Sequence, residues 1–171
     1  KLKKKKKINL KLNLNQKNKL LYFKLIRSKF LKKIYQNKEK SGGLMLRGYF
    51  KKNKKNFPLI SIVMPNYKSK YFLKSLHSVI NQVYKNIEII IIDGNSGNNT
   101  TKILKRYNNK IDLWISESDE GMWHAWNKGL KLARGEYVGI VDSSNVLFKN
   151  AAKILAKYII KYPKLDFICG S

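Results

Sequence analysis

The feature that most constrains the fold of this chain is an alternation of two hydrophobic periods after residue 58. Residues 60–64 and 87–92 are short β-branched apolar runs. The second run is nearly continuous, as in a strand that is covered on both faces. Between them, residues 72–83 repeat apolar side chains at helical spacing, which indicates a helix with one buried stripe. Strands that alternate with helices over short connections need right-handed crossovers, so we predict an α/β fold with a mainly parallel sheet.

The same alternation continues to the end of the chain. We expect a helix capped by Asn98 or Asn99, a strand at 113–115, a helix over 122–133 and a strand at 137–141. Asn150 is expected to cap a further helix, which ends before Pro163. Residues 167–169 are predicted to begin a fifth strand.

Acidic residues follow three successive predicted strands. Asp93 ends the second strand, Glu117 and Asp119 follow the third, and Asp142 follows the fourth. One acid after a strand is commonly a turn or cap residue, but three on one edge make that interpretation weaker. In open α/β sheets this edge forms the ligand crevice. The sequence therefore predicts a site for a cation or for ligand donors such as base N–H groups and ribose hydroxyls.

The positive charge is concentrated at the start of the chain. Residues 1–57 carry a net charge of +20 and residues 58–171 only +7, out of +27 in total, which divides the chain into a Lys-rich arm (1–57) and a domain (58–171). Within the arm, residues 20–35 suit either a basic amphipathic helix on an anionic membrane or a helix packed on the domain, and residues 51–55 read as a solvated linker. With 33 Lys against 4 Arg, nucleic acid is a disfavoured partner.

Several classes of protein are excluded by missing features. One cysteine and two histidines exclude a disulfide framework and a Cys- or His-rich metal centre. The sequence has neither a P-loop pattern nor G-x-G-x-x-G after the first strand, which disfavours P-loop NTPases and dehydrogenases. No uninterrupted apolar stretch reaches the length of a membrane span, and no secretory signal is visible, so we expect the cytosol.

Several ordered motifs resemble those of one known family. They are Pro58-Leu-Ile-Ser-Ile-Val-Met-Pro-Asn-Tyr67, Asn86-Ile-Glu-Ile-Ile-Ile-Ile-Asp-Gly94, Trp114-Ile-Ser-Glu-Ser-Asp-Glu-Gly121 and Ala125-Trp-Asn-Lys-Gly129. In this order and spacing they are similar to family-two glycosyltransferases with the GT-A fold, of the bacterial type that builds surface polysaccharides. The resemblance covers residues 58–171, the N-terminal, donor-binding part of such a domain, cut off after the fifth strand.

The resemblance implies a nucleotide-sugar donor, such as a UDP- or GDP-sugar, and a role for each matching residue. Pro65 and Tyr67 match the loop that lies against the base, and Asp93 matches an acid that accepts hydrogen bonds from base or ribose. Gly121 matches a position where the backbone approaches the nucleotide. Asp142 opens the segment that matches the D-x-D motif, which holds a divalent Mg or Mn ion against the diphosphate.

Two departures from the family pattern affect this interpretation. The D-x-D segment reads Asp142-Ser143-Ser144-Asn145, so a metal would depend on Asp142 with neutral help from Ser144 or Asn145. The general base of inverting members comes from the part after the fifth strand, so the catalytic residue is unknown and expected beyond Ser171. We therefore expect an inverting transferase that acts on a glycan or lipid-linked acceptor at the inner face of the membrane. The alternative is a catalytically inactive nucleotide-sugar-binding fragment or interaction module.

Overall fold

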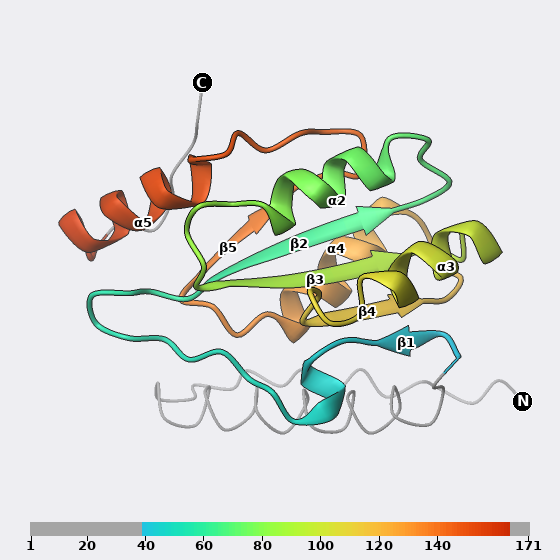
Figure 1. Cartoon of the computed structure of the whole chain (residues 1–171), viewed down its shortest axis with the longest axis horizontal. Helices are drawn as coiled ribbons and strands as arrows, with labels where there is room; N and C mark the ends of the chain where they lie inside the picture. The colour runs from blue at the N-terminus through green and yellow to red at the C-terminus, as the bar shows by residue number, and fades with distance from the viewer. Residues whose placement is uncertain (1–38, 165–171) are drawn as a thin grey trace, which may run out of the picture.

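A computed structural model describes residues 39–164 of the chain (Figure 1). Its elements are β1 (Ser41–Gly42), the short 3-10 helix η1 (Met45–Arg47), β2 (Ile60–Asn66), α2 (Phe72–Ile80), β3 (Ile87–Asp93), α3 (Asn98–Arg106), β4 (Leu113–Ser116), α4 (Met122–Leu132), β5 (Tyr137–Ile140) and α5 (Ala151–Lys161). The helix predicted over residues 20–35 and the strand predicted at 167–169 lie outside the described residues. Every other predicted strand and helix is present, with ends shifted by up to three residues.

The strands form one sheet of order β1-β4-β3-β2-β5. The four strands from β2 to β5 are parallel, and only β1 runs antiparallel, against β4. The prediction of a mainly parallel sheet is therefore confirmed. Because the parallel strands point the same way, their carboxyl ends meet at one edge, on the right in Figure 1.

Both faces of the sheet are covered by helices, which explains the continuous apolar runs. The side chains of Ile60, Ile62 and Met64 on β2 pack with α2, α3 and α5 on one face. Val63 on the same strand, with Ile90 and Ile92 of β3, packs with α4 on the other face. All seven residues of β2 and all seven of β3 are buried. A strand in this position has no solvent face on which polar residues could alternate.

Part of the segment that we assigned to the arm belongs to the folded domain. Ser41 and Gly42 pair with Ile115 and Trp114 at the edge of the sheet, and Met45 is 1% exposed in the core. Lys51, expected in a solvated linker, donates to the backbone oxygen of Ile87 (2.7 Å) and to the Asp112 carboxylate (2.8 Å). Charge density alone placed the boundary too late, because a lysine with a buried carboxylate partner is a structural residue.

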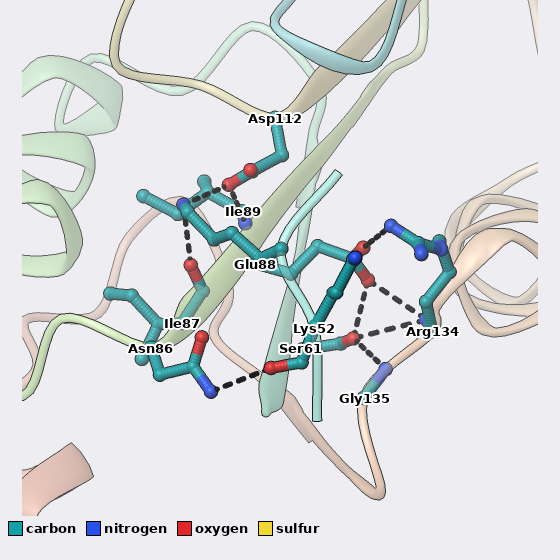
Figure 2. Close-up of polar contacts among 10 residues, drawn as sticks. Lys52, Ser61, Asn86, Ile87, Glu88, Ile89, Asp112, Arg134 and Gly135 are labelled. Carbon is teal, nitrogen blue, oxygen red and sulfur yellow. Dashed lines mark hydrogen bonds and ion pairs between the residues drawn. The ribbon is translucent and has the colours of Figure 1, made fainter. Parts of the chain in front are cut away.

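A polar cluster joins the strands at the edge opposite their carboxyl ends. Figure 2 shows the carboxylate of Glu88, which is 1% exposed, between Ser61 and Arg134. The Ser61 hydroxyl donates to Glu88 Oε2 (2.6 Å), and so does the backbone N–H of Arg134 (2.8 Å). The Arg134 guanidinium lies 3.8 Å from Glu88 Oε1. Burial raises the pKa of the Glu88 carboxyl, while these donors and the Arg134 charge oppose that shift.

One of the two predicted asparagine caps is at its predicted position. α3 begins at Asn98, so Gly97 occupies the cap position, with φ of 101° and no side-chain hydrogen bond. Asn150 does precede α5, but its side chain makes no cap hydrogen bond. Among the described residues, no helix is both long and apolar enough to cross a bilayer.

Candidate functional site

A pocket of about 650 Å³ opens at the carboxyl edge of the sheet. Residues that follow β2, β3, β4 and β5 contribute to it, together with the first turn of α4, so segments far apart in the sequence meet in one hollow. The lining residues are Pro65, Asn66, Tyr67, Gly94, Ser118, Asp119, Gly121, Met122, Ala125, Asp142, Ser143 and Ser144. The edge predicted from the acids after the strands therefore carries a pocket in the structure.

Five of the seven predicted site residues line this pocket: Pro65, Tyr67, Gly121, Asp142 and Ser144. Tyr67 is 65% exposed, so much of its side chain is accessible to a planar ligand that could stack on the ring. The ammonium group of Lys68 lies 5.1 Å from the centre of that ring and places a positive charge near the pocket. Asn145 does not line the pocket; its backbone N–H donates to the Asp142 backbone oxygen in a turn.

Asp93 does not present its carboxylate to the pocket, contrary to the prediction. The residue is fully buried, and it lies in register between Asn66 of β2 and Ser116 of β4. Its Oδ1 accepts from Asn66 Nδ2 (2.6 Å), and its Oδ2 accepts from the Ser116 hydroxyl (2.7 Å) and the Ser96 backbone N–H (3.0 Å). The carboxylate ties three strand ends together beneath the pocket.

Asn66 is a pocket residue that the sequence reasoning missed. Its amide nitrogen donates to Asp93 and to the Ser96 hydroxyl (3.1 Å), which fixes the orientation of the amide. Its Oδ1 is buried and has no hydrogen-bond partner among the described residues, and the same is true of Asp142 Oδ1. Unsatisfied buried acceptors are costly, so two of them at one pocket indicate a place for ligand donors or a cation.

Asp119 and Gly121 shape the loop that leads into α4. Asp119 Oδ1 accepts the backbone N–H of Gly121 (3.0 Å), and Gly121 has φ of 105°, which a side chain would disfavour. The other carboxylate oxygen of Asp119 lies so close to Gly94 that a Cβ there would meet it at 3.1 Å. Asp119 thus brings a second carboxylate to the pocket. Its place after the third strand was visible in the sequence.

Other polar and aromatic residues of α4 do not line the pocket. Lys128 is 6% exposed, and its ammonium group pairs with Glu117 at 2.6 Å, so it is held in place and does not line the pocket. The rings of Trp123 and Trp126 have centres 4.8 Å apart, and Trp123 is 68% exposed and is not a core residue. His124 Nδ1 accepts the backbone N–H of Glu120 at the start of α4.

The pocket lining carries two carboxylates and, among the described residues, no Lys or Arg. The described residues also contain no group of three or more His, Cys, Asp or Glu that could hold a metal ion by themselves. Mg²⁺ and Mn²⁺ commonly take one or two carboxylates from the protein and further oxygens from phosphate and water. The unpartnered Asp142 Oδ1 fits that limited role, so this pocket suits an ion that arrives with a diphosphate.

The sequence that forms this pocket matches one protein family. Residues 61–171 match the model of "Glycosyl transferase family 2". The match covers more than half of the chain and contains every predicted site residue, so the protein belongs to glycosyltransferase family 2.

Individual relatives agree with this assignment. The chain is 31% identical over 115 residues to the UDP-Glc:alpha-D-GlcNAc-diphosphoundecaprenol beta-1,3-glucosyltransferase WfgD of Escherichia coli, a match that covers 66% of this chain and 45% of WfgD. The fold of this chain is similar to that of S. aureus TarS in complex with UDP-GlcNAc, with a TM-score of 0.56 and 28% identity over 61% of this chain and 32% of TarS.

A second solved structure supports the fold alone. It is the mannosyltransferase PcManGT of Pyrobaculum calidifontis in complex with GDP-Man and Mn²⁺, with a TM-score of 0.52 and 21% identity over 82% of this chain and 39% of that one. Together with TarS it identifies the mostly parallel sheet and flanking helices as the GT-A fold. The chain spans less than half the length of the curated relatives that it matches.

Proposed function

We propose that this chain binds the donor in a glycosyltransferase that moves a sugar from a nucleotide-sugar to an acceptor hydroxyl in cell-envelope or surface polysaccharide synthesis. The observation that carries the proposal is the pocket at the carboxyl edge, where Tyr67, Gly121 and Asp142 meet. The names of the relatives support the donor class, since TarS was solved with UDP-GlcNAc and WfgD is named for UDP-Glc. WfgD is also named for a lipid-linked acceptor, which we propose as the acceptor class here.

Each lining residue has a role in this proposal that follows from its chemistry. The exposed ring of Tyr67, beside Pro65, stacks on the base. Asn66 Oδ1 accepts a donor from base or ribose, while Asp93 acts through Asn66 by holding its amide in place. Asp142 and Ser144 lie at the diphosphate, and Gly121 leaves room for the nucleotide beside α4. Inversion would follow from a single displacement, and we assign the general base to none of the described residues.

A divalent ion, if bound, would be held by Asp142, with the Ser144 hydroxyl and the diphosphate as further ligands. The ion would neutralise charge on the leaving nucleoside diphosphate. Without it, the two carboxylates of Asp119 and Asp142 would repel the diphosphate, since no lining residue described here is cationic. Lys68, whose ammonium group lies over the Tyr67 ring, brings a positive charge near the pocket.

Calorimetry tests the donor site directly. We expect UDP or GDP to bind the full chain, and to bind more tightly with Mn²⁺ present than with a chelator. Asp142→Asn should remove most of the Mn²⁺ effect, because it removes the charged ligand. Ser61→Ala is the matched control, because it alters a buried polar group at the opposite edge. A folded protein that binds no nucleoside diphosphate under either condition would contradict the proposal.

A second function is favoured by one observation. The segment after β5 keeps a single carboxylate, Asp142, followed by Ser143, Ser144 and Asn145. This pattern suits a module that binds a nucleotide-sugar without transferring the sugar. Ser144→Asp should then strengthen Mn²⁺-dependent nucleotide binding without creating hydrolysis of a UDP-sugar. Release of UDP from a UDP-sugar by the unmodified chain, measured by a coupled assay, would exclude the inactive module.

A further inference from the structure

The outer face of α5 combines exposed apolar side chains with a row of lysines. Ile154 is 52% exposed, Tyr158 49% and Tyr162, just past the helix end, 43%, so about half of each residue faces solvent. They are four residues apart, so they form one stripe along the helix. Lys153, Lys157 and Lys161, each one residue earlier, form a parallel exposed stripe beside them.

The inner face of the same helix is an ordinary core face. Ala152, Ala156 and Ile159 are all at most 5% exposed and belong to the core on the side of α2 and α3. The exposed apolar stripe is therefore additional to the apolar face that folding requires. Figure 1 shows α5 at one end of the molecule, where its far side faces no other described element.

On this face, two tyrosine rings stack on each other and a lysine ammonium group lies over one of them. The rings of Tyr158 and Tyr162 stack with centres 6.2 Å apart, and the ammonium group of Lys161 lies 5.1 Å from the centre of the Tyr162 ring. Just before the helix, Phe148 is 87% exposed. Tyrosine with an apolar body and a polar tip, beside lysines with long apolar stems, suits a boundary between water and an apolar phase.

The charge of this region has one sign. Residues 143–164 contain five lysines and no acidic residue. α3 makes an informative comparison, because it also carries exposed lysines at Lys102 and Lys105 but shows no large exposed apolar side chain. The combination of both features, and not basic charge alone, distinguishes α5 from α3.

We propose that the outer face of α5, with Phe148, docks on an anionic phospholipid bilayer. Exposed Ile, Phe and Tyr side chains enter the interface, and the lysine row meets the anionic headgroups. A second copy of the chain is a poorer occupant, because a twofold contact would set the lysine rows of two copies against each other. This surface is distinct from the arm at residues 1–57, and vesicle binding needs neither donor nor acceptor, so the proposal stands apart from the proposed function.

Vesicle co-sedimentation with the full chain tests this surface. The vesicles are phosphatidylcholine alone or mixed with phosphatidylglycerol, at about 0.15 M salt to limit long-range attraction by the arm. The triple variant Lys153→Ala, Lys157→Ala and Lys161→Ala should lower partitioning to the mixed vesicles at least about tenfold. The control is the triple variant Lys102→Ala, Lys105→Ala and Lys110→Ala, which removes the same charge from the exposed surface at and just after α3. It should lower partitioning to the mixed vesicles about twofold at most.

The apolar half of the proposal needs its own variant. Phe148→Ser lies outside the helix and leaves the charge and the core unchanged, and it should also reduce partitioning with an unchanged urea midpoint. Equal losses in the two lysine triples would overturn the proposal, since charge alone would explain them. So would unchanged partitioning of Phe148→Ser, or a wild type that is dimeric in sedimentation and becomes monomeric in the α5 triple. Wild-type binding to DNA that is lost in the α5 triple, without vesicle binding, would assign the face to nucleic acid instead.

Discussion

The two edges of the sheet differ in how their buried oxygen atoms are paired. At the amino edge, Ser61, Glu88 and Asp112 find partners within the protein, as Figure 2 shows. At the carboxyl edge, Asn66 and Asp142 each keep a buried oxygen without a partner among the described residues, and Tyr67 leaves its ring exposed. Ser61 and Asn66 lie near the two ends of β2, so one strand carries a residue of each kind.

This contrast separates residues that hold the fold from residues that are available to a ligand. A buried acceptor with its donors stabilises the chain, whereas an orphaned acceptor lowers the stability of the free protein. Such a cost is expected where a site is kept ready for a ligand. Substitutions at the amino edge should therefore change unfolding free energy, and substitutions at the carboxyl edge should change nucleotide binding.

The largest effect is expected at Asp112. Asp112→Ala removes the acceptor of the Ile89 backbone N–H (2.8 Å) and of the Lys51 ammonium group (2.8 Å), with the carboxylate almost fully buried. We expect a loss of about 3 kcal/mol in the free energy of unfolding, measured by urea denaturation. Asp112→Asn should lose less, because its amide oxygen still accepts from Ile89. A stability equal to wild type in Asp112→Ala would show that the amino edge does not hold the fold.

The second-largest effect is expected at the carboxyl edge, where it should appear in nucleotide binding and not in stability. Asp142→Asn should weaken UDP binding in Mn²⁺ about thirtyfold, equivalent to about 2 kcal/mol, because a neutral amide is a poor cation ligand. The urea midpoint of the variant should equal that of the wild type or be higher. Asp142 Oδ1 is buried without a hydrogen-bond partner among the described residues, so its charge does not stabilise the free protein. A variant that unfolds more easily but binds UDP normally would reverse the assignment of the two edges.

Much of the fold followed from the sequence because its signals are local. The β2 and β3 runs and the helical stripe of α2 appear where their periods placed them. The pairing of β1 was not predictable in this way, because two residues, Ser41 and Gly42, carry no period. Its position depends on contacts far along the chain, such as the Gly43 backbone N–H donating to Asn108 Oδ1 (2.6 Å).

The site was predictable at the level of strand ends but not of side-chain direction. Parallel strands bring their carboxyl ends together, so Asp119 and Asp142 could be grouped in advance, whereas Tyr67 and Gly121 were added by the resemblance to the family. Asp93 follows the same rule, yet its neighbours in register, Asn66 and Ser116, draw its carboxylate beneath the pocket. Whether a side chain turns outward or inward depends on cross-strand partners, and these are known only once the strand order is known.

A smaller effect on the carboxyl edge is expected at Tyr67. Tyr67→Ala removes an exposed ring from the pocket and should weaken UDP binding about tenfold, the upper range for loss of one aromatic stack. Tyr67→Phe keeps the ring and should bind within about twofold of wild type. Titration calorimetry gives both values, and the urea midpoints should match because the side chain is largely exposed. Equal binding by all three proteins would remove Tyr67 from the site.

The smallest effect is expected at Glu88. It should appear as a pH dependence of the free energy of unfolding. Burial raises the pKa of its carboxyl above the value in the unfolded chain, against the opposing influence of Ser61 and Arg134. The folded protein then holds this proton more tightly, so the stabilisation is complete below the unfolded pKa and is lost as pH rises through the folded pKa. Glu88→Gln does not titrate. Its amide oxygen can still accept from the Ser61 hydroxyl and the Arg134 backbone N–H, and its loss of the Arg134 charge contact is a separate cost.

The readout is therefore the pH dependence of a difference in stability, not the difference itself. Urea unfolding of wild type and Glu88→Gln should be measured from about pH 4 upward. As pH rises through the acidic range, the free energy of unfolding of the wild type should fall relative to that of the variant. A gap that widens in favour of the wild type would mean that Arg134 and the two donors outweigh burial, so that the ionised carboxylate is the form that the amino edge stabilises. UDP affinity at one fixed pH should be the same in both proteins, because Glu88 lies at the edge away from the pocket.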